Sequence, residues 1–229
     1  MLSPVVRELT LDPGEGFSFV AGQWVNLRMP LAEGATGEPV VRAYSIASPP
    51  RADGTYDVAV TKVEGGPMST WLHAIAPGET ITQSHAQGFF TLDERALDDG
   101  RPLLMIATGT GISPIRSMLL SREAAPPTAP VALVFGNRTE HDVLYREDFE
   151  RLAQAWPRFT FAPVLSRAPA SWSGRAGHVQ VHLSEILGTL GEDVDAYVCG
   201  LNRMVSDVRG LLRKEHGLPR GRVHTERYD

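Results

Sequence analysis

The stretch Leu103-Leu104-Met105-Ile106-Ala107-Thr108-Gly109-Thr110-Gly111-Ile112-Ser113-Pro114 decides the fold of this chain. Its apolar start is typical of a buried strand, and the glycines that follow indicate a tight turn into a helix. Ser113 can cap that helix and Pro114 can begin it, so backbone amides and a helix N-terminus face the same point. This arrangement suits a phosphate group, although the glycines could equally serve only to tighten the turn.

Strand and helix patterns alternate from residue 100 onward. This alternation predicts a parallel sheet with helices on both faces. Ligands of such sheets lie beyond the carboxyl ends of the strands, and the Thr108–Gly111 turn falls at that edge. We expect strands at Leu103–Ala107, Val131–Phe135, Phe159–Val164, Ala196–Cys199 and Arg222–Glu226, and helices at Pro114–Ser121, Leu144–Gln154, Val179–Leu187 and Arg203–His216.

The first 100 residues have a different pattern, in which short alternating segments are separated by turn residues. One helix is expected at Thr70–Ala76, with Ser69 as its N-cap. These segments predict a small antiparallel β-barrel over residues 1–97, followed by a doubly wound α/β domain over residues 98–229. The expected strands of the barrel are Phe17–Val20, Gln23–Met29, Val40–Ile46, Tyr56–Val63 and Thr80–Gln83.

Composition and charge narrow the possible functions. The single cysteine excludes an internal disulfide and a four-cysteine iron–sulfur cluster, and we expect no metal site. No stretch reaches the ~20 apolar residues of a membrane helix, and the N-terminus has no secretory pattern, so we expect a cytoplasmic protein without a membrane partner. Residues 1–100 carry 6 Lys and Arg against 13 Asp and Glu, a net charge of −7, which argues against nucleic acid as a partner.

Cys199 ends an expected strand directly before Gly200. A lone cysteine there is usually a buried structural thiol. A strand that ends in Cys-Gly before a helix would instead leave the thiol beside an open crevice, where a planar nicotinamide could lie. The position at the carboxyl edge of the sheet favours this second interpretation.

Arg42-Ala43-Tyr44-Ser45 lies on an expected strand of the barrel, with Arg42 and Tyr44 on one face and Ser45 on the other. A guanidinium suits a pyrophosphate, a tyrosine ring offers a stacking surface, and a hydroxyl can donate to a ring nitrogen. Standing alone, the string would be an ordinary surface strand. Gly65-Gly66-Pro67 adds a second glycine-rich entry to a helix. Two phosphate-competent sites in two domains imply two nucleotides.

Five motifs in this order resemble the ferredoxin–NADP reductase superfamily. The resemblance covers almost the whole chain and implies an FAD-binding barrel followed by an NAD(P)-binding domain, with FAD favoured over FMN. The motifs are Arg42-Ala43-Tyr44-Ser45, Gly66-Pro67-Met68-Ser69, Gly109-Thr110-Gly111-Ile112-Ser113-Pro114, Val198-Cys199-Gly200-Leu201 and Glu226-Arg227-Tyr228.

The resemblance also implies roles for single residues. Arg42 would contact the flavin pyrophosphate, Tyr44 would stack on the isoalloxazine, and Ser45 would approach N5. Tyr228 would cover the opposite flavin face and move aside for the nicotinamide. The catalytic residues implied are Ser45, Cys199, Glu226 and Tyr228. Further cofactor contacts are implied for Ala43, Ala59, Val60, Thr61, Gly66, Pro67, Met68, Ser69, Thr108, Gly109, Thr110, Gly111, Pro114, Cys199 and Gly200.

The choice of nicotinamide depends on cations near the end of the third strand of the second domain. Ser166-Arg167 matches the family's Ser-Arg pair for the 2′-phosphate of NADP, and Arg175 is a second candidate. NADPH is therefore favoured over NADH as hydride donor, and both stay open. A tenfold preference needs only ~1.4 kcal/mol, which one Arg–phosphate contact can supply.

The function implied is transfer of a hydride from NAD(P)H to FAD and then of single electrons to a separate acceptor protein, such as a ferredoxin or flavodoxin. One alternative is the reductase component of a multicomponent oxygenase. Another is a non-catalytic flavin- or nucleotide-binding electron-transfer subunit. Members that reduce acidic ferredoxins commonly have a basic flavin domain, so the net charge of −7 argues for a different acceptor. The sequence leaves the oligomeric state open.

Overall fold

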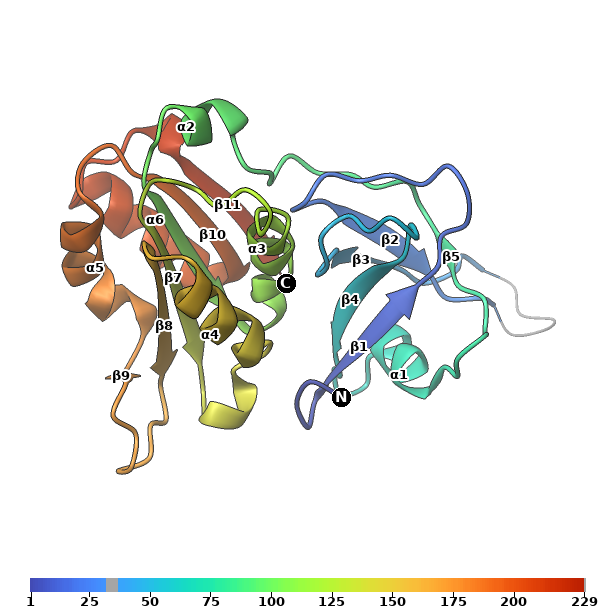
Figure 1. Cartoon of the computed structure of the whole chain (residues 1–229). Helices are drawn as coiled ribbons and strands as arrows, with labels where there is room; N and C mark the ends of the chain where they lie inside the picture. The colour runs from blue at the N-terminus through green and yellow to red at the C-terminus, as the bar shows by residue number, and fades with distance from the viewer. Residues whose placement is uncertain (32–36, 229) are drawn as a thin grey trace.

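Two lobes lie side by side in the computed structural model, which describes residues 1–31 and 37–228 (Figure 1). The first lobe contains β1 (Val6–Leu11), β2 (Trp24–Arg28), β3 (Val41–Ser45), β4 (Tyr56–Thr61), α1 (Pro67–Ala74) and β5 (Thr82–Gln83). α2 (Glu94–Asp98) follows, and the predicted boundary between residues 97 and 98 falls inside it. The second lobe contains β6 (Leu103–Thr108), α3 (Ile112–Leu120), β7 (Val131–Asn137), α4 (Arg146–Ala155), β8 (Phe159–Leu165), β9 (Arg175–Ala176), α5 (Leu183–Leu190), β10 (Asp195–Leu201), α6 (Asn202–Lys214) and β11 (Val223–Tyr228).

The first lobe is built from two antiparallel sheets. β1 pairs with β4, and β2 lies between β3 and β5. A bridge between Ile46 and Val58 joins the two sheets. Alternate residues of β2, among them Val25 and Leu27, point into a core that α1 covers through Leu72. The expected barrel architecture is therefore confirmed.

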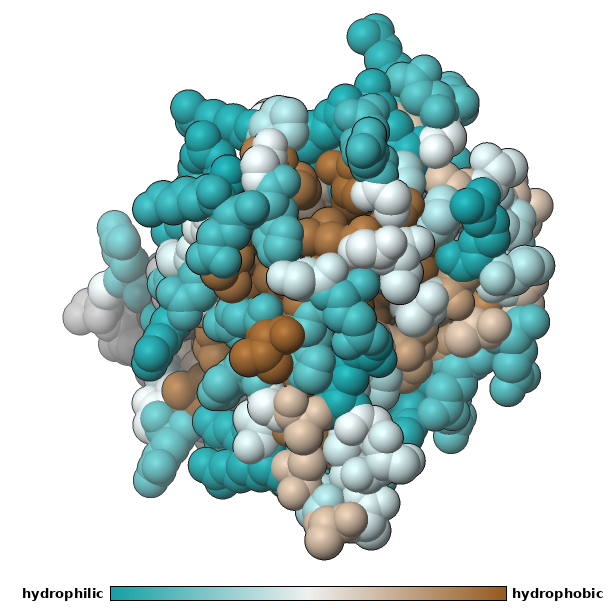
Figure 2. Space-filling view, turned by 90° about the vertical axis from the view of Figure 1, so that its left-hand side faces the viewer, coloured by the Kyte–Doolittle hydropathy of each residue, from teal (hydrophilic) through white to brown (hydrophobic). Residues whose placement is uncertain are grey.

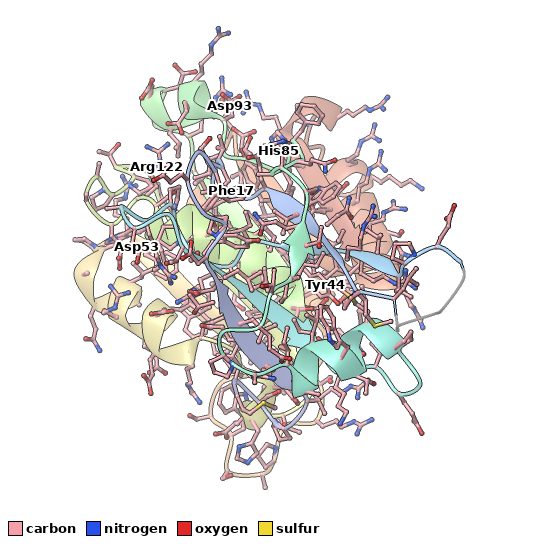
Figure 3. The ribbon with its side chains drawn as sticks, turned by 90° about the vertical axis from the view of Figure 1, so that its right-hand side faces the viewer. Phe17, Tyr44, Asp53, His85, Asp93 and Arg122 are labelled. Atoms are coloured by element: carbon pink, nitrogen blue, oxygen red, sulfur yellow. The ribbon has the colours of Figure 1, made fainter. Side chains whose placement is uncertain are left out.

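The edges of the barrel differ from the sequence-based expectation. The prediction of a strand at Phe17–Val20 is wrong, because this segment is irregular and the Phe17 ring stacks on Tyr56 with 5.2 Å between ring centroids (Figure 3). The expected strand at Thr80–Gln83 shortens to the two residues of β5. β1 was not predicted, because its polar residues hide the alternation that its pairing with β4 requires.

The helix α1 begins three residues earlier than expected. Gly66 is its N-cap and Pro67 its first residue, so the prediction of Ser69 as N-cap is wrong. The Ser69 hydroxyl instead accepts a hydrogen bond from the Val63 amide at 3.1 Å and donates to the Gly66 carbonyl at 3.1 Å. Ser69 therefore shapes the turn before the helix and leaves the first amides of the helix without a side-chain cap.

The second lobe is a doubly wound α/β domain, as expected. Its six parallel strands run in the order β11-β10-β6-β7-β8-β9. α3 and α4 pack on one face of the sheet, and α5 and α6 pack on the other (Figure 1). The side of the molecule on which α5 lies is mostly hydrophilic, with hydrophobic residues largely recessed between polar ones (Figure 2).

The core under α3 and α4 continues into the first lobe. Val6, Ala59 and Phe90 pack in the same apolar cluster as Ile112 and Met118 of α3. The two lobes therefore share buried apolar surface, which is worth roughly 25 cal/mol per Å² removed from water. None of the described helices has the length and apolar character needed to span a membrane.

Candidate functional site

Ser45, Glu226 and Tyr228 come together between the two lobes. The Tyr228 hydroxyl donates to the Ser45 hydroxyl at 2.5 Å, and the Ser45 hydroxyl donates to a Glu226 carboxylate oxygen at 3.0 Å. Ser45 ends β3, whereas Glu226 and Tyr228 lie on β11, the edge strand of the parallel sheet. Cys199 joins the group because it lies beside Glu226 in the register of β10 and β11. The four residues predicted to be catalytic are thus neighbours.

Burial controls the protonation of this group. It raises the pKa of the Cys199 thiol well above its usual value, and the nearby Glu226 carboxylate adds to the shift. It also raises the pKa of the Tyr228 hydroxyl. The thiol and the phenol are therefore both neutral at physiological pH. Burial raises the pKa of Glu226 as well, and the hydrogen bond from Ser45 partly opposes that shift.

The prediction of an open crevice beside Cys199 is wrong. The thiol is fully buried within the apolar cluster, and Tyr228 packs against that cluster. The aromatic ring therefore occupies the side from which a planar ligand would reach the thiol. The motif resemblance implied that Tyr228 must move aside for the nicotinamide, whereas the local pattern at Cys199-Gly200 carries no information on where the last strand of the sheet lies.

The turn after β6 fits closely against the end of β10. A Cβ atom at Gly111 would lie 2.5 Å from the Cys199 carbonyl oxygen, and one at Gly200 would lie 2.2 Å from the Thr108 hydroxyl. Gly200 also has φ +143°, which other residues rarely adopt. The Leu201 amide donates to the Thr108 hydroxyl at 3.3 Å. These glycines let two strand ends approach closely at the edge where the sheet binds ligands.

The start of α3 differs from the prediction in one respect. The helix begins at Ile112 after a 3₁₀ turn at Gly109–Gly111, so Ser113 lies inside the helix and is not its cap. The Ser113 hydroxyl is buried without a hydrogen-bond partner among the described residues. The Ile112 amide already donates to the Gly109 and Thr110 carbonyls, whereas Thr108, the N-cap of the 3₁₀ turn, gives the amides of that turn no side-chain hydrogen bond. The turn therefore keeps free backbone donors, which fit a dinucleotide phosphate.

The predicted flavin side has a free cation beside a partly buried ring. The Arg42 guanidinium is exposed, and its one hydrogen bond among the described residues goes to the Val41 carbonyl at 2.8 Å. Tyr44 packs against the barrel core close to α1 (Figure 3), and burial raises its pKa to about 12. The uncapped start of α1 adds further donors. This donor set fits the pyrophosphate and ring of a flavin dinucleotide.

Several predicted contacts have side chains that point away from this space. Val60, Met68 and Ser69 are buried, and the Val60 carbonyl already accepts from His73 at 2.9 Å. They could line a cofactor site only through backbone atoms. Thr61 is exposed instead, and its hydroxyl lies 3.5 Å from that of Thr110, which joins the two lobes beside the dinucleotide turn.

The cations near the end of β8 are unequal. Arg175 pairs with Glu185 at 2.6 Å, so its charge is already compensated. Arg167 is exposed next to Ser166, and its amide donates to the Arg138 carbonyl at 2.9 Å. Arg138 is also exposed, and within the described part of the chain neither guanidinium has an ionic partner. Sequence reasoning missed Arg138, although its place directly after the end of β7 could have indicated it.

A groove of about 740 Å³ opens beside Glu226 and was also missed. The barrel lines it with Trp24, Phe89 and Phe90, and β11 lines it with His224 and Thr225. Phe89 is 100% exposed, which is unusual for an aromatic ring. The groove could have been suspected from Gly88-Phe89-Phe90 in a loop, but not its position beside β11.

A hollow of about 400 Å³ next to β11 is lined by cations. Arg209, Arg213 and Lys214 of α6 and Arg227 of β11 surround Ser206 and Gly210. No ion pair among the described residues includes any of these four cations. Successive residues of a strand point to opposite faces of its sheet, so Glu226 lines the groove on one face of β11 and Arg227 lines this hollow on the other.

Comparisons with known proteins agree with this geometry. Residues 5–91 match the family described as oxidoreductase FAD-binding domain, and residues 105–210 match the oxidoreductase NAD-binding domain. The chain is 46% identical to ferredoxin--NADP reductase B of Sorangium cellulosum, over 100% of this chain and 93% of that protein. It is 32% identical to the xylene/toluene monooxygenase electron transfer component XylA of Pseudomonas putida, over 97% of this chain and 61% of that protein.

Among solved structures, the fold is similar to that of a ferredoxin NADP+ reductase from Neisseria gonorrhoeae with bound FAD and NADP. The TM-score is 0.83 at 25% identity, and the match covers 98% of this chain and 93% of that chain. The domain order, the glycine turns at the strand ends and the relative of nearly equal length point to one family. The chain belongs to the ferredoxin–NADP reductase superfamily of FAD-dependent NAD(P)H oxidoreductases.

Proposed function

We propose that this protein oxidises NADPH by hydride transfer to bound FAD and passes the electrons singly to a separate carrier protein with an acidic face. The observation that carries the proposal is the hydrogen-bonded chain from Tyr228 through Ser45 to Glu226, which joins the barrel and the nucleotide domain at one point. FAD supplies the ability to accept a hydride and release single electrons, and the protein supplies orientation and electrostatics.

Tyr228 acts in this proposal as a lid that holds the nicotinamide position. Its ring covers the Cys199 side of the site, and its hydroxyl donates a hydrogen bond to the Ser45 hydroxyl. Movement of Tyr228 would uncover the thiol and release Ser45 as a hydrogen-bond donor or acceptor. The space between Cys199, Ser45 and Glu226 would then receive a flat ring. The cost of moving the lid limits how tightly the nucleotide binds.

Ser45, Glu226 and Cys199 position groups in this proposal and form no covalent bonds. Ser45 is held by its bond to Glu226 and is therefore directed before any ligand enters. The buried thiol of Cys199 stays protonated and offers a soft, neutral contact surface. Gly200 directly follows Cys199, and the turn at Gly111 packs against the Cys199 carbonyl, so the dinucleotide phosphates and the nicotinamide would be fixed by one continuous edge.

NADPH is the better donor because free positive charge lies where the 2′-phosphate would bind. Arg167 and Arg138 are exposed without ionic partners in the described residues, whereas Arg175 is paired with Glu185. A charge-assisted contact from one guanidinium to a phosphate is enough for a tenfold preference. Ser166 adds a hydroxyl at the same strand end.

The cationic hollow on α6 and the groove beside Glu226 together form the proposed docking surface for the electron acceptor. Four cations that have no ionic partner in the described part of the chain favour an acidic partner, since complementary charges steer encounter. The groove offers Trp24 and Phe89 as apolar anchors at the same strand. Arg227 lies one residue, about 3.8 Å along the backbone, from both Glu226 and Tyr228. The acidic charge of the first 100 residues therefore does not exclude an acidic acceptor, because the cations lie on the nucleotide domain.

The alternative, the reductase component of an oxygenase, is favoured by one observation. The chain resembles a monooxygenase electron transfer component over nearly its whole length, although it spans only 61% of that relative. The chemistry at FAD is the same in both cases, and only the acceptor differs. The docking surface would serve any carrier with an acidic face.

The lid interpretation predicts that removing the Tyr228 ring strengthens nucleotide binding. Tyr228→Ser should lower the NADP+ dissociation constant about tenfold, because displacing the ring no longer costs free energy. Tyr228→Phe loses only the hydrogen bond to Ser45, so its NADP+ dissociation constant should lie between those of Tyr228→Ser and the wild type. Difference absorption titrations of the FAD-loaded proteins measure this. An unchanged dissociation constant in Tyr228→Ser would contradict the lid.

The pKa of Glu226 predicts a pH-dependent stability difference. The folded pKa lies above the unfolded value of 4.5, so the stability associated with the protonated carboxyl is present below pH 4.5 and is lost as the pH rises through the folded pKa. Glu226→Gln cannot ionise. Its free energy of unfolding should therefore increase relative to that of wild type between pH 4 and pH 7, so that the variant becomes relatively more stable, as measured by urea unfolding. Glu215→Gln, at an exposed position, is the control. If the free energy of unfolding of Glu226→Gln relative to wild type did not change with pH, the raised pKa of Glu226 would be refuted.

The donor preference depends on Arg167. Arg167→Ala should lower kcat/KM for NADPH about tenfold and change that for NADH less than twofold, because only NADPH carries the 2′-phosphate. Arg209→Ala, on the opposite side of the sheet, should leave the ratio of the two values unchanged. Steady-state kinetics with both nucleotides measure this, and equal losses with NADPH and NADH would exclude a phosphate contact.

The docking surface predicts a selective defect in electron delivery. In the double variant Arg209→Glu and Arg213→Glu, the KM for a plant-type ferredoxin of low isoelectric point should rise at least tenfold, and the wild-type rate should fall with added salt. The rate of FAD reduction by NADPH alone should stay within twofold of wild type. Arg158→Glu is the matched control, since it reverses an exposed charge elsewhere on the same domain. If Arg158→Glu raised the KM as much as the double variant does, the docking surface would lie elsewhere.

A further inference from the structure

Two neighbouring residues of α3 grip the barrel directly behind the site. The Arg116 guanidinium donates through Nη1 to the Ala47 carbonyl at 2.8 Å, and the Ser117 hydroxyl donates to the Ser48 carbonyl at 2.6 Å. Ala47 and Ser48 are fully buried, and they follow Ser45 by two and three residues. The helix of the nucleotide domain thus holds the segment that leaves the flavin-facing end of β3.

The Arg116 side chain is held on several sides. Its Nε donates to Asp148 at 2.7 Å, its Nη1 lies 3.8 Å from the Asp57 carboxylate, and its guanidinium carbon lies 4.1 Å from the centroid of the Tyr145 ring. The side chain is only 12% exposed. A planar fork with five donors can make these contacts together, whereas a lysine ammonium cannot.

The barrel side of the contact is equally fixed. Asp57, 2% exposed, accepts from Arg51 at 2.9 Å and from the Thr10 hydroxyl at 2.8 Å. Its backbone amide donates to the Ser48 hydroxyl at 3.0 Å, and its carbonyl accepts from the Ala47 amide at 2.7 Å. The two carbonyls that α3 holds therefore belong to a segment that cannot shift without disturbing β4.

Tyr145 has a backbone conformation that indicates a constraint. Its φ of 55° is left-handed, which costs a residue other than glycine free energy and is kept only where surrounding contacts require it. The residue begins α4 and lays its ring under Arg116. Its hydroxyl is buried beside the Glu8 carboxylate of β1. The strained residue thus completes the contact between α4, α3 and the barrel.

The position of this cluster along α3 gives it a function. α3 starts at the Gly109–Gly111 turn, which is proposed to hold the dinucleotide, and Arg116 follows Gly111 by five residues, about 7.5 Å along a helix. One short, rigid helix therefore connects the dinucleotide turn to the segment after Ser45. A small change in the tilt of α3 would move nicotinamide and flavin apart by a similar amount.

We propose that Arg116 and Ser117, supported by Tyr145, form a clamp that sets the distance between nicotinamide and flavin, and that they are positioning residues for hydride transfer. The inference rests on the proposed function, because it concerns the geometry of that reaction. In this proposal the clamp residues do not contact either cofactor. They act by fixing the nucleotide turn relative to Ser45, and a misplacement of about 1 Å can cost up to a hundredfold in rate.

The test compares Arg116→Met, Arg116→Lys and Ser117→Ala with wild type and with Arg158→Met, which removes an exposed guanidinium bound to the Thr128 carbonyl. Three quantities are measured on each FAD-loaded protein: the rate of flavin reduction by NADPH in stopped flow, the NADP+ dissociation constant, and the long-wavelength charge-transfer absorption after mixing reduced protein with NADP+. The last two do not depend on turnover.

A clamp predicts a specific split between these quantities. Arg116→Met should reduce flavin at least tenfold more slowly and lose most of the charge-transfer absorption, while the NADP+ dissociation constant stays within threefold. Arg116→Lys should recover part of the rate, Ser117→Ala should lose about threefold, and Arg158→Met should match wild type. A general loss of structure would instead weaken NADP+ and FAD binding together.

Other outcomes overturn the inference in distinguishable ways. Reduction within twofold of wild type in Arg116→Met would refute the clamp and leave the proposed function intact. If Arg116→Met fails to retain FAD, Ser117→Ala is measured in its place. A wild-type rate of flavin reduction and a wild-type charge-transfer absorption in Ser117→Ala would then refute the clamp. A wild-type protein that neither NADPH nor NADH reduces would refute the proposed function and the clamp with it.

Discussion

The Ser45 hydroxyl is the point on which the arrangement of the site depends. It accepts from Tyr228 and donates to Glu226, two residues on the last strand of a different domain. A hydroxyl has one proton to donate, so Glu226 is the acceptor and Tyr228 the donor, and the two bonds together fix the orientation of the Ser45 hydroxyl. The contact is possible only because β11 lies at the edge of the sheet beside β10, with Cys199 opposite Glu226. Sheet order, domain contact and site geometry are therefore one constraint.

The same constraint explains why small residues occur where the two strand ends meet. Gly111 and Gly200 allow the turn after β6 to approach the end of β10 closely. This close approach brings backbone donors near Cys199. Behind the turn, α3 ties the nucleotide domain to the barrel through Arg116. In front of it, Tyr228 fills the position of the proposed nicotinamide. A flavin reductase needs both features, since two cofactors must meet in a fixed geometry and one of them must be able to leave.

Much of this could be predicted from local patterns, and the rest depends on tertiary contacts. The alternation of strand and helix patterns predicted the parallel sheet, and the resemblance of the ordered motifs implied that Ser45, Cys199, Glu226 and Tyr228 belong to one site. The open crevice at Cys199 was wrong because a residue 29 positions later covers it. β1 was missed because its pairing with β4 overrides its polar sequence. Ser69 and Ser113 looked like helix caps, but the glycines before them begin the helices. Arg116 gave no signal except a charge in an apolar helix, since its partners come from both domains.

An anaerobic titration of the FAD-loaded protein with NADPH, and separately with NADH, shows whether this protein transfers a hydride from a nicotinamide to FAD. The flavin absorption band is followed, and the released flavin is identified by chromatography. Stoichiometric uptake of FAD is expected, with bleaching of the band at near-stoichiometric NADPH and only at a clear excess of NADH. A protein that binds neither FAD nor FMN, or whose flavin stays oxidised with both nucleotides, would contradict this hydride transfer.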